Sequence, residues 1–160
     1  MDYFATYSGP LGTLLLVSDG TALTGLYMNR EAPSESPELP LFRKASAWLD
    51  GYFRGQPRSI DFPLKAAGTA FQQRVWKLLQ QIPFGETRTY GQLAGELAQR
   101  MGKEKMSAQA VGQAVGKNPI SILIPCHRVV GAKGQLTGYA GGIENKAWLL
   151  RHEGWEGEST

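Results

Sequence analysis

The chain has 160 residues, of which 42% are hydrophobic, and this composition is enough to bury a core and excludes general disorder. Its single cysteine, Cys126, excludes an intramolecular disulfide and a CxxC metal cluster. Its net charge of +3 leaves a nucleic-acid partner open. The sequence contains no run of about 18 apolar residues and begins without the features of a signal peptide, so we expect a soluble, intracellular protein without membrane contact.

The N-terminal part alternates apolar and polar residues and contains several turn signals. We expect strands over residues 3–7, 14–17 and 22–28, joined by hairpins at Gly9-Pro10 and Asp19-Gly20. A loop rich in proline, serine and glutamate follows, and apolar residues then recur at helical spacing over 41–52. These patterns predict a small α+β domain over residues 1–64.

The second part predicts a helical domain over residues 65–155, followed by a short tail over 156–160. Helical spacing is present over 71–82 and 93–98, and Ser107 is placed to cap a third helix over 108–116. The small residues of this third helix indicate a winged helix-turn-helix, with tight helix packing as the alternative. An apolar, strand-like run over 120–124 precedes the cysteine, and a final helix is expected over 143–152.

Charge is distributed unevenly between these two parts. Residues 1–64 hold five basic and seven acidic residues, a net charge of −2. Residues 65–160 hold twelve basic and seven acidic residues, a net charge of +5. This asymmetry favours the second part as the one that meets a polyanion, although charge alone is weak support for DNA binding.

Cys126 lies in a sequence context that suggests an activated thiol. A lone cysteine is by default a small buried hydrophobe, but this one follows a proline and precedes His127. The only other histidine, His152, lies beside Glu153. A thiol becomes a strong nucleophile when a base takes its proton and an acid orients that base. Cys126, His127 and Glu153 supply these residue types, but sequence neighbours need not face one another.

Several motifs in order resemble those of the O6-alkylguanine-DNA alkyltransferase family, the methylated-DNA–protein-cysteine methyltransferases. They are IPCHRV at 124–129, the preceding Asn118-Pro119, GYAGG at 138–142 and WLLRHEG at 148–154. The resemblance covers about residues 69–155, and the first 64 residues match the family in strand and helix order only. It implies direct DNA repair by an S-methyltransferase that acts once and uses no cofactor or metal.

The resemblance assigns roles to the residues around the thiol. Cys126 would keep the alkyl group of O6-alkylguanine, and possible substrates extend to O4-alkylthymine. His127 would act through a water molecule and be stabilised by Glu153, while Asn118 would bridge the active-site turn and the helix-turn-helix. Tyr90 would donate a hydrogen bond towards N3 of the flipped guanine and crowd the phosphate backbone. The expected pocket is formed by Val115, Ser121, Val129 and the lid residues Tyr139, Ala140 and Gly141.

The implied partner is double-stranded DNA, bound through the minor groove without sequence specificity by a protein that is monomeric when free. Ser107 and Ala108 begin the expected recognition helix, and Gln109 occupies the position where the family usually has an intercalating arginine. We expect Arg100, Lys103 and Lys105 to compensate by contacting phosphates. Lys117 is also expected near DNA, with a solvated surface as the equal alternative.

Other residues favour structural roles. We expect Arg128 to pair with a buried carboxylate such as that of Asp61 or Glu86, and Trp76 and Trp148 to lie in the core. His152 is expected to act as a cation at a helix C-terminus.

Two other functions compete with alkyl transfer. A non-catalytic protein that recognises alkylated bases and recruits repair factors would bind damaged DNA without an adduct, and the retained Cys126 argues against it. A Cys-His hydrolase unrelated to DNA would turn over an ester or amide, and the basic helix-turn-helix gives no reason for that chemistry. The discriminating feature is an irreversible alkyl adduct on Cys126.

Overall fold

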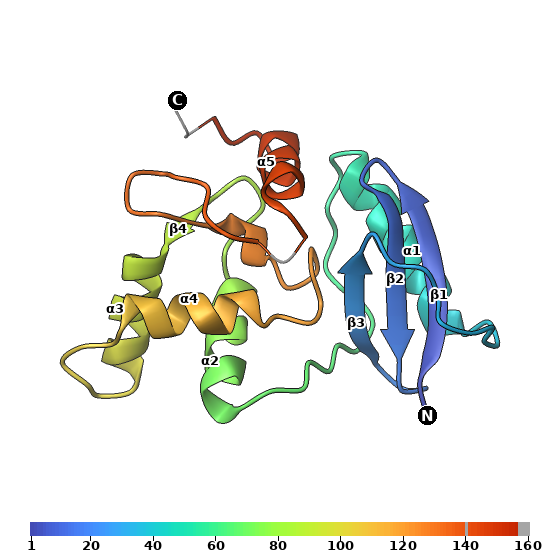
Figure 1. Ribbon diagram of the computed structural model, residues 1–160, viewed down its shortest axis with the longest axis horizontal. Coiled ribbons are helices and arrows are strands. Elements are labelled where there is room, and N and C mark those ends of the chain that lie inside the picture. The colour runs from blue at the N-terminus through green and yellow to red at the C-terminus, as the bar shows by residue number, and fades with distance from the viewer. Residues whose placement is uncertain (140, 157–160) are drawn as a thin grey trace. The chain divides into compact units, whose positions relative to one another are not determined.

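The computed structural model describes residues 1–139 and 141–156 and divides into two compact units (Figure 1). The first comprises Met1–Ala67 with Pro119–Leu123, and the second comprises Gly68–Asn118 with the chain from Ile124 onward. The predicted α+β class, with an N-terminal antiparallel sheet, is confirmed. The sequence analysis did not anticipate that residues 119–123 cluster with the first unit.

The first unit contains a three-stranded antiparallel sheet and one helix. Its elements are β1 (Tyr3–Gly9), β2 (Gly12–Ser18), β3 (Leu23–Met28) and α1 (Pro40–Phe53). The sheet order is β1-β2-β3, so β2 is central and its residues Leu14 and Leu16 have no exposed surface. Ala45, Leu49 and Tyr52 of α1 are equally buried, which makes them part of the core of this unit.

The apolar run over 120–124 is not the extended segment that the sequence suggested. Its backbone bonds to β3 at one residue, because Leu26 donates to the Pro119 carbonyl at 2.9 Å and accepts from the Ser121 N–H at 3.2 Å. The chain then turns sharply at Ile122, whose φ of 71° is rare for a β-branched residue. The strand-like prediction was wrong because an apolar run reports burial and not backbone direction.

The second unit is mainly helical. Its elements are α2 (Ala70–Leu79), β4 (Arg88–Thr89), α3 (Tyr90–Arg100), α4 (Ala108–Gly116), the one-turn 3₁₀ helix η1 (Cys126–Arg128), β5 (Val129–Val130) and α5 (Ile143–His152). Reciprocal capping boxes begin two of the helices, with Thr69 and Gln72 on α2 and Thr89 and Gln92 on α3. Strands β4 and β5 pair in parallel.

Trp76 connects α2 to the predicted recognition helix. Its side chain is 2% exposed, which confirms the expected core position, and its Nε1–H donates to the Ala114 carbonyl of α4 at 2.9 Å. A Cβ at Gly68 would lie 2.4 Å from the indole, so only glycine fits there. Trp148, the other tryptophan assigned to the core, is only half-buried.

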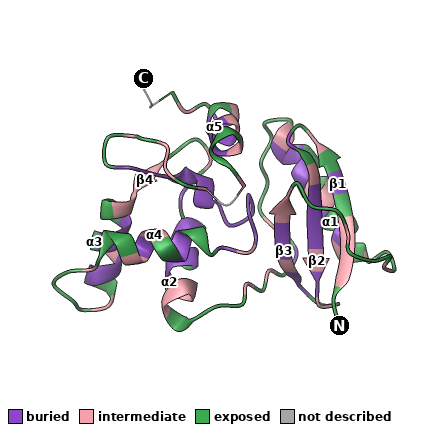
Figure 2. Cartoon of the chain, in the orientation of Figure 1, coloured by how far each residue is buried: buried purple, intermediate pink, exposed green. Residues whose placement is uncertain are grey.

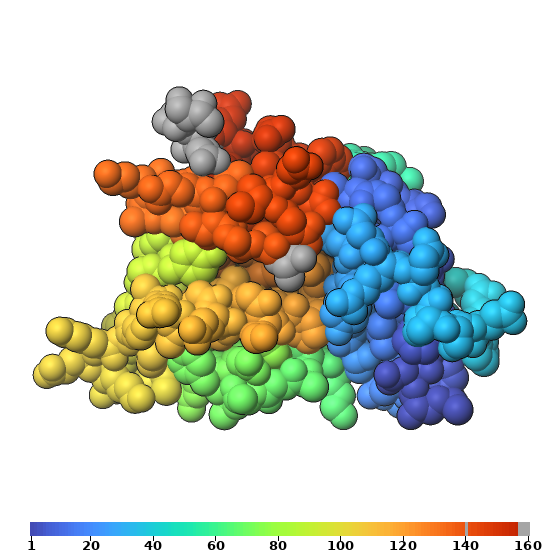
Figure 3. Space-filling model, viewed as in Figure 1, coloured from blue at the N-terminus to red at the C-terminus, as the bar shows by residue number. Residues whose placement is uncertain are grey.

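Helices α3 and α4 and the segment 101–107 between them form the predicted helix, turn and helix. Ser107 caps α4 as expected, because its Oγ accepts from the Ala110 N–H at 3.1 Å. Figure 2 shows exposed residues alternating with buried ones along α4. In Figure 3 the yellow segment before α4 protrudes from this unit, and α4 itself lies at the surface. None of the helices in residues 1–139 and 141–156 is long and apolar enough to span a membrane.

Candidate active site

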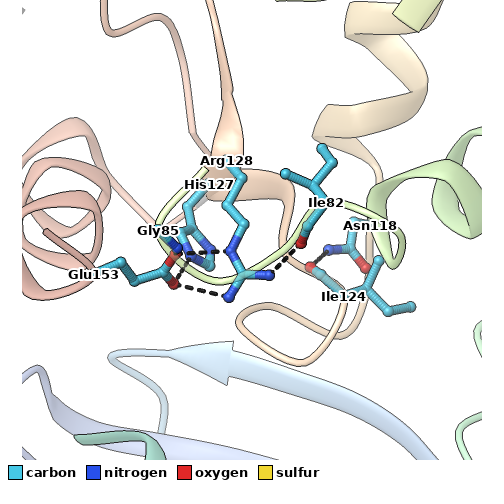
Figure 4. A network of polar contacts seen from close by, with 7 residues as sticks. All are labelled: Ile82, Gly85, Asn118, Ile124, His127, Arg128 and Glu153. Atoms are coloured by element: carbon cyan, nitrogen blue, oxygen red, sulfur yellow. Dashed lines mark hydrogen bonds and ion pairs between the residues drawn. The ribbon is translucent and has the colours of Figure 1, made fainter. Parts of the chain in front are cut away.

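The carboxylate of Glu153 is the centre of a buried polar network (Figure 4). Glu153 follows the last residue of α5, and its side chain is 1% exposed. Its Oε2 lies 2.6 Å from His127 Nε2, and its Oε1 accepts from Arg128 Nε at 2.8 Å and from the Gly85 N–H at 3.2 Å. The network therefore joins α5, η1 and the turn after α2.

Arg128 pairs with a buried carboxylate, as predicted, but its partner is Glu153 rather than Asp61 or Glu86. A second bond runs from Arg128 Nη2 to Glu153 Oε2 at 3.1 Å, so the contact is bidentate. Arg128 Nη1 also donates to the Ile82 carbonyl at 2.6 Å. The partner was misassigned because sequence distance does not show that the end of α5 returns to the cysteine turn.

The charges around Glu153 hold it in its ionised form. Burial alone raises the pKa of a carboxyl group, but the hydrogen bonds from His127 and Arg128 and the charge of Arg128 outweigh it and lower the pKa of Glu153 to about 2. Burial lowers the pKa of His127, and the contact with Glu153 opposes that shift. The imidazole is therefore neutral at rest and has a carboxylate beside it to stabilise an added proton.

The tautomer of His127 follows from its partner. An ionised carboxylate only accepts hydrogen bonds, so Nε2 carries the ring proton and Nδ1 is the basic nitrogen. No hydrogen-bond partner for Nδ1 is present among residues 1–139 and 141–156, although the side chain has no exposed surface. The ring is therefore oriented by Glu153 and keeps a basic nitrogen for proton transfer.

Cys126 is buried in the turn that the network supports. Asn118, which follows α4, donates from Nδ2 to the Ile124 carbonyl at 2.7 Å and so links the end of α4 to the turn before the cysteine. Burial raises the pKa of the Cys126 thiol, while hydrogen bonding from Asn118, the charge of Lys146 and hydrogen bonding from Tyr139 oppose the shift. The thiol is therefore protonated at pH 7 and needs a base to react.

Tyr90 begins α3, and its half-buried hydroxyl lies 2.7 Å from Thr137 Oγ1. Burial raises the pKa of Tyr90, so the phenol is neutral at pH 7 and is available as a hydrogen-bond donor.

The predicted pocket residues occupy different surroundings. Val115 and Val129 are buried in the second unit, whereas Tyr139 and Gly141 are half-buried. The Gly141 carbonyl accepts from Asn145 Nδ2 at 2.8 Å, which ties this end of the predicted lid to α5. Ser121 is buried in the segment that clusters with the first unit, and Ala140 lies outside the described residues.

Most residues predicted to bind DNA lie at the two ends of α4 or in the segment before it, while Tyr90 and Arg100 are the first and last residues of α3. Ser107, Ala108 and Gln109 are exposed at the start of α4, and Lys117 is exposed at its end. Lys103 and Lys105 are exposed in the protruding segment. Arg100 differs, because its guanidinium already bonds to Glu96 at 2.8 Å and to Gln81 at 3.2 Å. His152, the expected helix-terminal cation, ends α5 and stacks on Trp148 at 5.0 Å.

Three features of the site escaped the sequence analysis. The Gly85 N–H and the Thr137 hydroxyl carry no sequence signal, because backbone donors and single threonines occur everywhere. The third feature, Lys146, did have a sequence signal, because helical spacing places it on the apolar side of α5 with Ile143, Ala147 and Leu150. A lysine at such a position is unusual, and its side chain is indeed buried.

No cluster of three or more histidine, cysteine, aspartate or glutamate side chains suited to a metal is present within the described part of the chain. The site combines the thiol of Cys126 with an oriented imidazole, a carboxylate, an amide and a phenol, which belong to His127, Glu153, Asn118 and Tyr90. This set is suited to nucleophilic attack by sulfur with a base to take its proton.

Comparisons with known proteins identify what the chain resembles. Residues 70–155 match the family model described as "6-O-methylguanine DNA methyltransferase, DNA binding domain", and residues 3–66 match the "ribonuclease-like domain" of the same methyltransferase. A methylated-DNA–protein-cysteine methyltransferase of Methanosarcina acetivorans is 44% identical over 160 residues, covering 95% of this chain and 98% of the relative. One of Haemophilus influenzae is also 44% identical, covering 94% and 86%.

Solved structures agree with these matches. The crystal structure of the Mycobacterium tuberculosis O6-methylguanine methyltransferase superposes with a TM-score of 0.81 at 46% identity, covering 96% of this chain and 93% of that one. A structure of the M. tuberculosis protein in complex with DNA gives a TM-score of 0.80 at 45% identity, covering 94% and 91%.

Proposed function

Because the chain belongs to the 6-O-methylguanine DNA methyltransferase family, we propose that it repairs duplex DNA by moving a methyl group from O6 of guanine to the Cys126 sulfur. The observation that carries this proposal is the buried arrangement at the cysteine turn, where His127 follows the thiol and is held by Glu153 at 2.6 Å. The chain thus combines a nucleophile, an oriented base and a DNA-binding domain.

The chemistry begins with removal of the thiol proton. His127 accepts it at Nδ1 through a water molecule, and the carboxylate of Glu153 stabilises the resulting imidazolium against the nearby charge of Arg128. The Cys126 thiolate then attacks the methyl carbon, an S–C bond forms as the C–O6 bond breaks, and the electron pair of that bond stays on guanine. Guanine regains one proton, which balances the one lost by the thiol. A soft thiolate suits attack at an alkyl carbon.

The target base has to leave the duplex, because the buried sulfur of Cys126 cannot reach an O6 atom while the base is stacked inside the DNA helix. Unstacking costs a few kcal/mol, and contacts of the flipped base with the pocket offset this cost. The neutral Tyr90 hydroxyl lies 2.7 Å from Thr137 Oγ1 in the structure, and with a flipped guanine in the site it donates towards N3 of that base. That bond stabilises the negative charge that develops on the departing base.

The product is a thioether, which has no easy leaving group, so each protein molecule acts once. We test this with methylated duplex in tenfold excess over protein and count restored guanines. The expected plateau is one guanine per protein molecule, and continued repair would contradict the single-use proposal. A duplex with O4-methylthymine in the same assay tests the extension of this chemistry to thymine.

We expect Gln109→Arg to strengthen binding to duplex DNA and to raise the repair rate. Gln109 is exposed near the start of α4, where a side chain can enter the minor groove and fill the space of the flipped base. An arginine adds cation stacking worth about 0.5–2 kcal/mol. The control is Gln113→Arg, one turn further along the exposed side of α4. Equal gains from both substitutions would mean that added charge, and not the position of Gln109, limits binding.

Replacing Lys103 and Lys105 together with glutamine is expected to lower the salt dependence of DNA binding. Both lysines are exposed in the segment that protrudes before α4. Each phosphate contact contributes about 0.9 to the slope of log affinity against log salt, so the slope should lose about 2. The measurement is a titration of affinity at several salt concentrations, with Lys44→Gln in the first unit as the control. An unchanged slope would remove these lysines from the interface.

A further inference from the structure

Lys146 is a buried cation on α5 without a carboxylate partner. Its residue is 1% exposed, and no carboxylate of residues 1–139 and 141–156 lies within 4.0 Å of its Nζ. Within the described part of the chain, the one hydrogen bond of its side chain is to the Thr137 carbonyl at 3.4 Å, which is long for an N–H···O bond. Nζ also lies 6.0 Å from the centre of the Tyr90 ring. This ammonium therefore lies near Thr137 and Tyr90 of the candidate site and is poorly compensated.

An uncompensated buried charge is costly, so a structural role explains Lys146 badly. A methionine or leucine would fill the same space without the loss of hydration that an ammonium suffers. Burial lowers the pKa of Lys146 to about 8, and the interaction with Cys126 opposes that shift. The side chain therefore remains mostly charged at pH 7, and the group of opposite sign with which it interacts is the thiolate of Cys126.

We propose that Lys146 is an electrostatic positioning residue whose ammonium stabilises the thiolate of Cys126 between its deprotonation and its attack on the alkyl carbon. This inference rests on the proposed function. Charge neutralisation by Lys146 lasts only until the S–C bond forms, because the thioether is neutral. The ammonium transfers no proton and forms no bond in this step. Its effect is to raise the fraction of protein molecules that carry a thiolate.

Other ionisable groups face the same space, and they make the prediction specific. Tyr90 from α3 and Tyr139 from the predicted lid are phenols, and His127 from η1 is the proposed base. The charge of Lys146 disfavours a proton on His127, which Glu153 offsets through its hydrogen bond. Removing the ammonium should therefore lower the thiolate fraction of Cys126 and make His127 more basic. The ionisation of the thiol itself distinguishes the first effect from the second.

The experiment compares wild type with Lys146→Met, Lys146→Arg and the control Lys133→Met, which removes an exposed lysine of the same unit. Alkylation of Cys126 by iodoacetamide is followed against pH, since its rate reports the thiolate fraction. We expect Lys146→Met to move the midpoint of this profile to higher pH and to slow alkylation at pH 7 about tenfold for each unit of that shift. Lys146→Arg should restore most of the rate, and Lys133→Met should match wild type.

Methyl transfer from DNA should slow in Lys146→Met by the same factor, with affinity for unmodified duplex unchanged. A wild-type pH profile for Lys146→Met overturns the proposal, whatever its repair rate. If Lys146→Met fails to fold, Lys146→Gln takes its place in the same comparison. Failure of the proposed function has a different signature, because wild type would then accept no methyl group from DNA while its iodoacetamide profile still reports on Lys146.

Discussion

Glu153→Gln is expected to lower the free energy of unfolding at pH 7 by about 3–5 kcal/mol, because it leaves a buried cation without its counter-charge. The carboxylate of Glu153 holds Arg128 through two bonds of 2.8 and 3.1 Å and His127 at 2.6 Å. A neutral amide cannot compensate the guanidinium. The measurement is denaturant unfolding followed by circular dichroism.

The matched control is Glu96→Gln, which also removes a glutamate paired with an arginine. That pair lies on the surface of α3, with side chains about half exposed, and such pairs contribute about 0–1 kcal/mol. Equal losses for the two variants would contradict the importance assigned to the buried network.

The same substitution should change the acid dependence of stability. The pKa of Glu153 falls from 4.5 in the unfolded chain to about 2 in the folded protein. Between these values the unfolded chain binds more protons, so this contribution is complete above pH 4.5 and is lost as pH falls towards 2. Its size is about 3 kcal/mol at 1.36 kcal/mol per pKa unit. The stability of Glu153→Gln should lack this part of the decline.

His127→Gln is expected to slow methyl transfer by about 10²–10⁴-fold, which is the usual contribution of a general base. Its Nδ1 is the basic nitrogen because Nε2 donates to Glu153, and glutamine offers no nitrogen that can take a proton. Single-turnover transfer from a duplex with one O6-methylguanine measures the rate. DNA affinity should not change, because His127 is buried.

The control for this prediction is His152→Gln, which replaces the other histidine of the chain. His152 lies at the end of α5, stacked on Trp148 and outside the Glu153 network. Wild-type rates are expected for it. A rate for His127→Gln within threefold of wild type would show that another group takes the thiol proton.

Helices α1–α5 and the N-terminal strands β1–β3 were predictable because each has a periodic apolar pattern or local start and stop signals, whereas the short elements β4, β5 and η1 have neither. The cap at Ser107 and the antiparallel N-terminal strands followed from neighbouring residues alone. The backbone path of residues 120–124 was not predictable, because its turn depends on hydrogen bonds between Leu26 and the segment after Asn118. A left-handed Ile122 is a conformation that only tertiary contacts maintain.

The candidate site was predictable in its residue types but not in its partners. The order of the motifs identified Cys126, His127 and Glu153, because the resemblance extends over most of the second domain. The bidentate contact of Arg128 with Glu153 depends on the return of α5 to the cysteine turn, which no local pattern shows. The burial of Lys146 was visible in the helical spacing of α5, but its approach to Thr137 and Tyr90 was not.

The most direct test of alkyl transfer is intact mass with peptide mapping after incubation with duplex DNA that holds one O6-methylguanine. We predict one added methyl group per protein molecule, located on Cys126, with restoration of guanine in the DNA. Cys126→Ala should bind the same duplex and gain no mass. Binding of the lesion by wild type without an adduct, restored guanine without a methylated protein, or a methyl group on another residue would contradict the account.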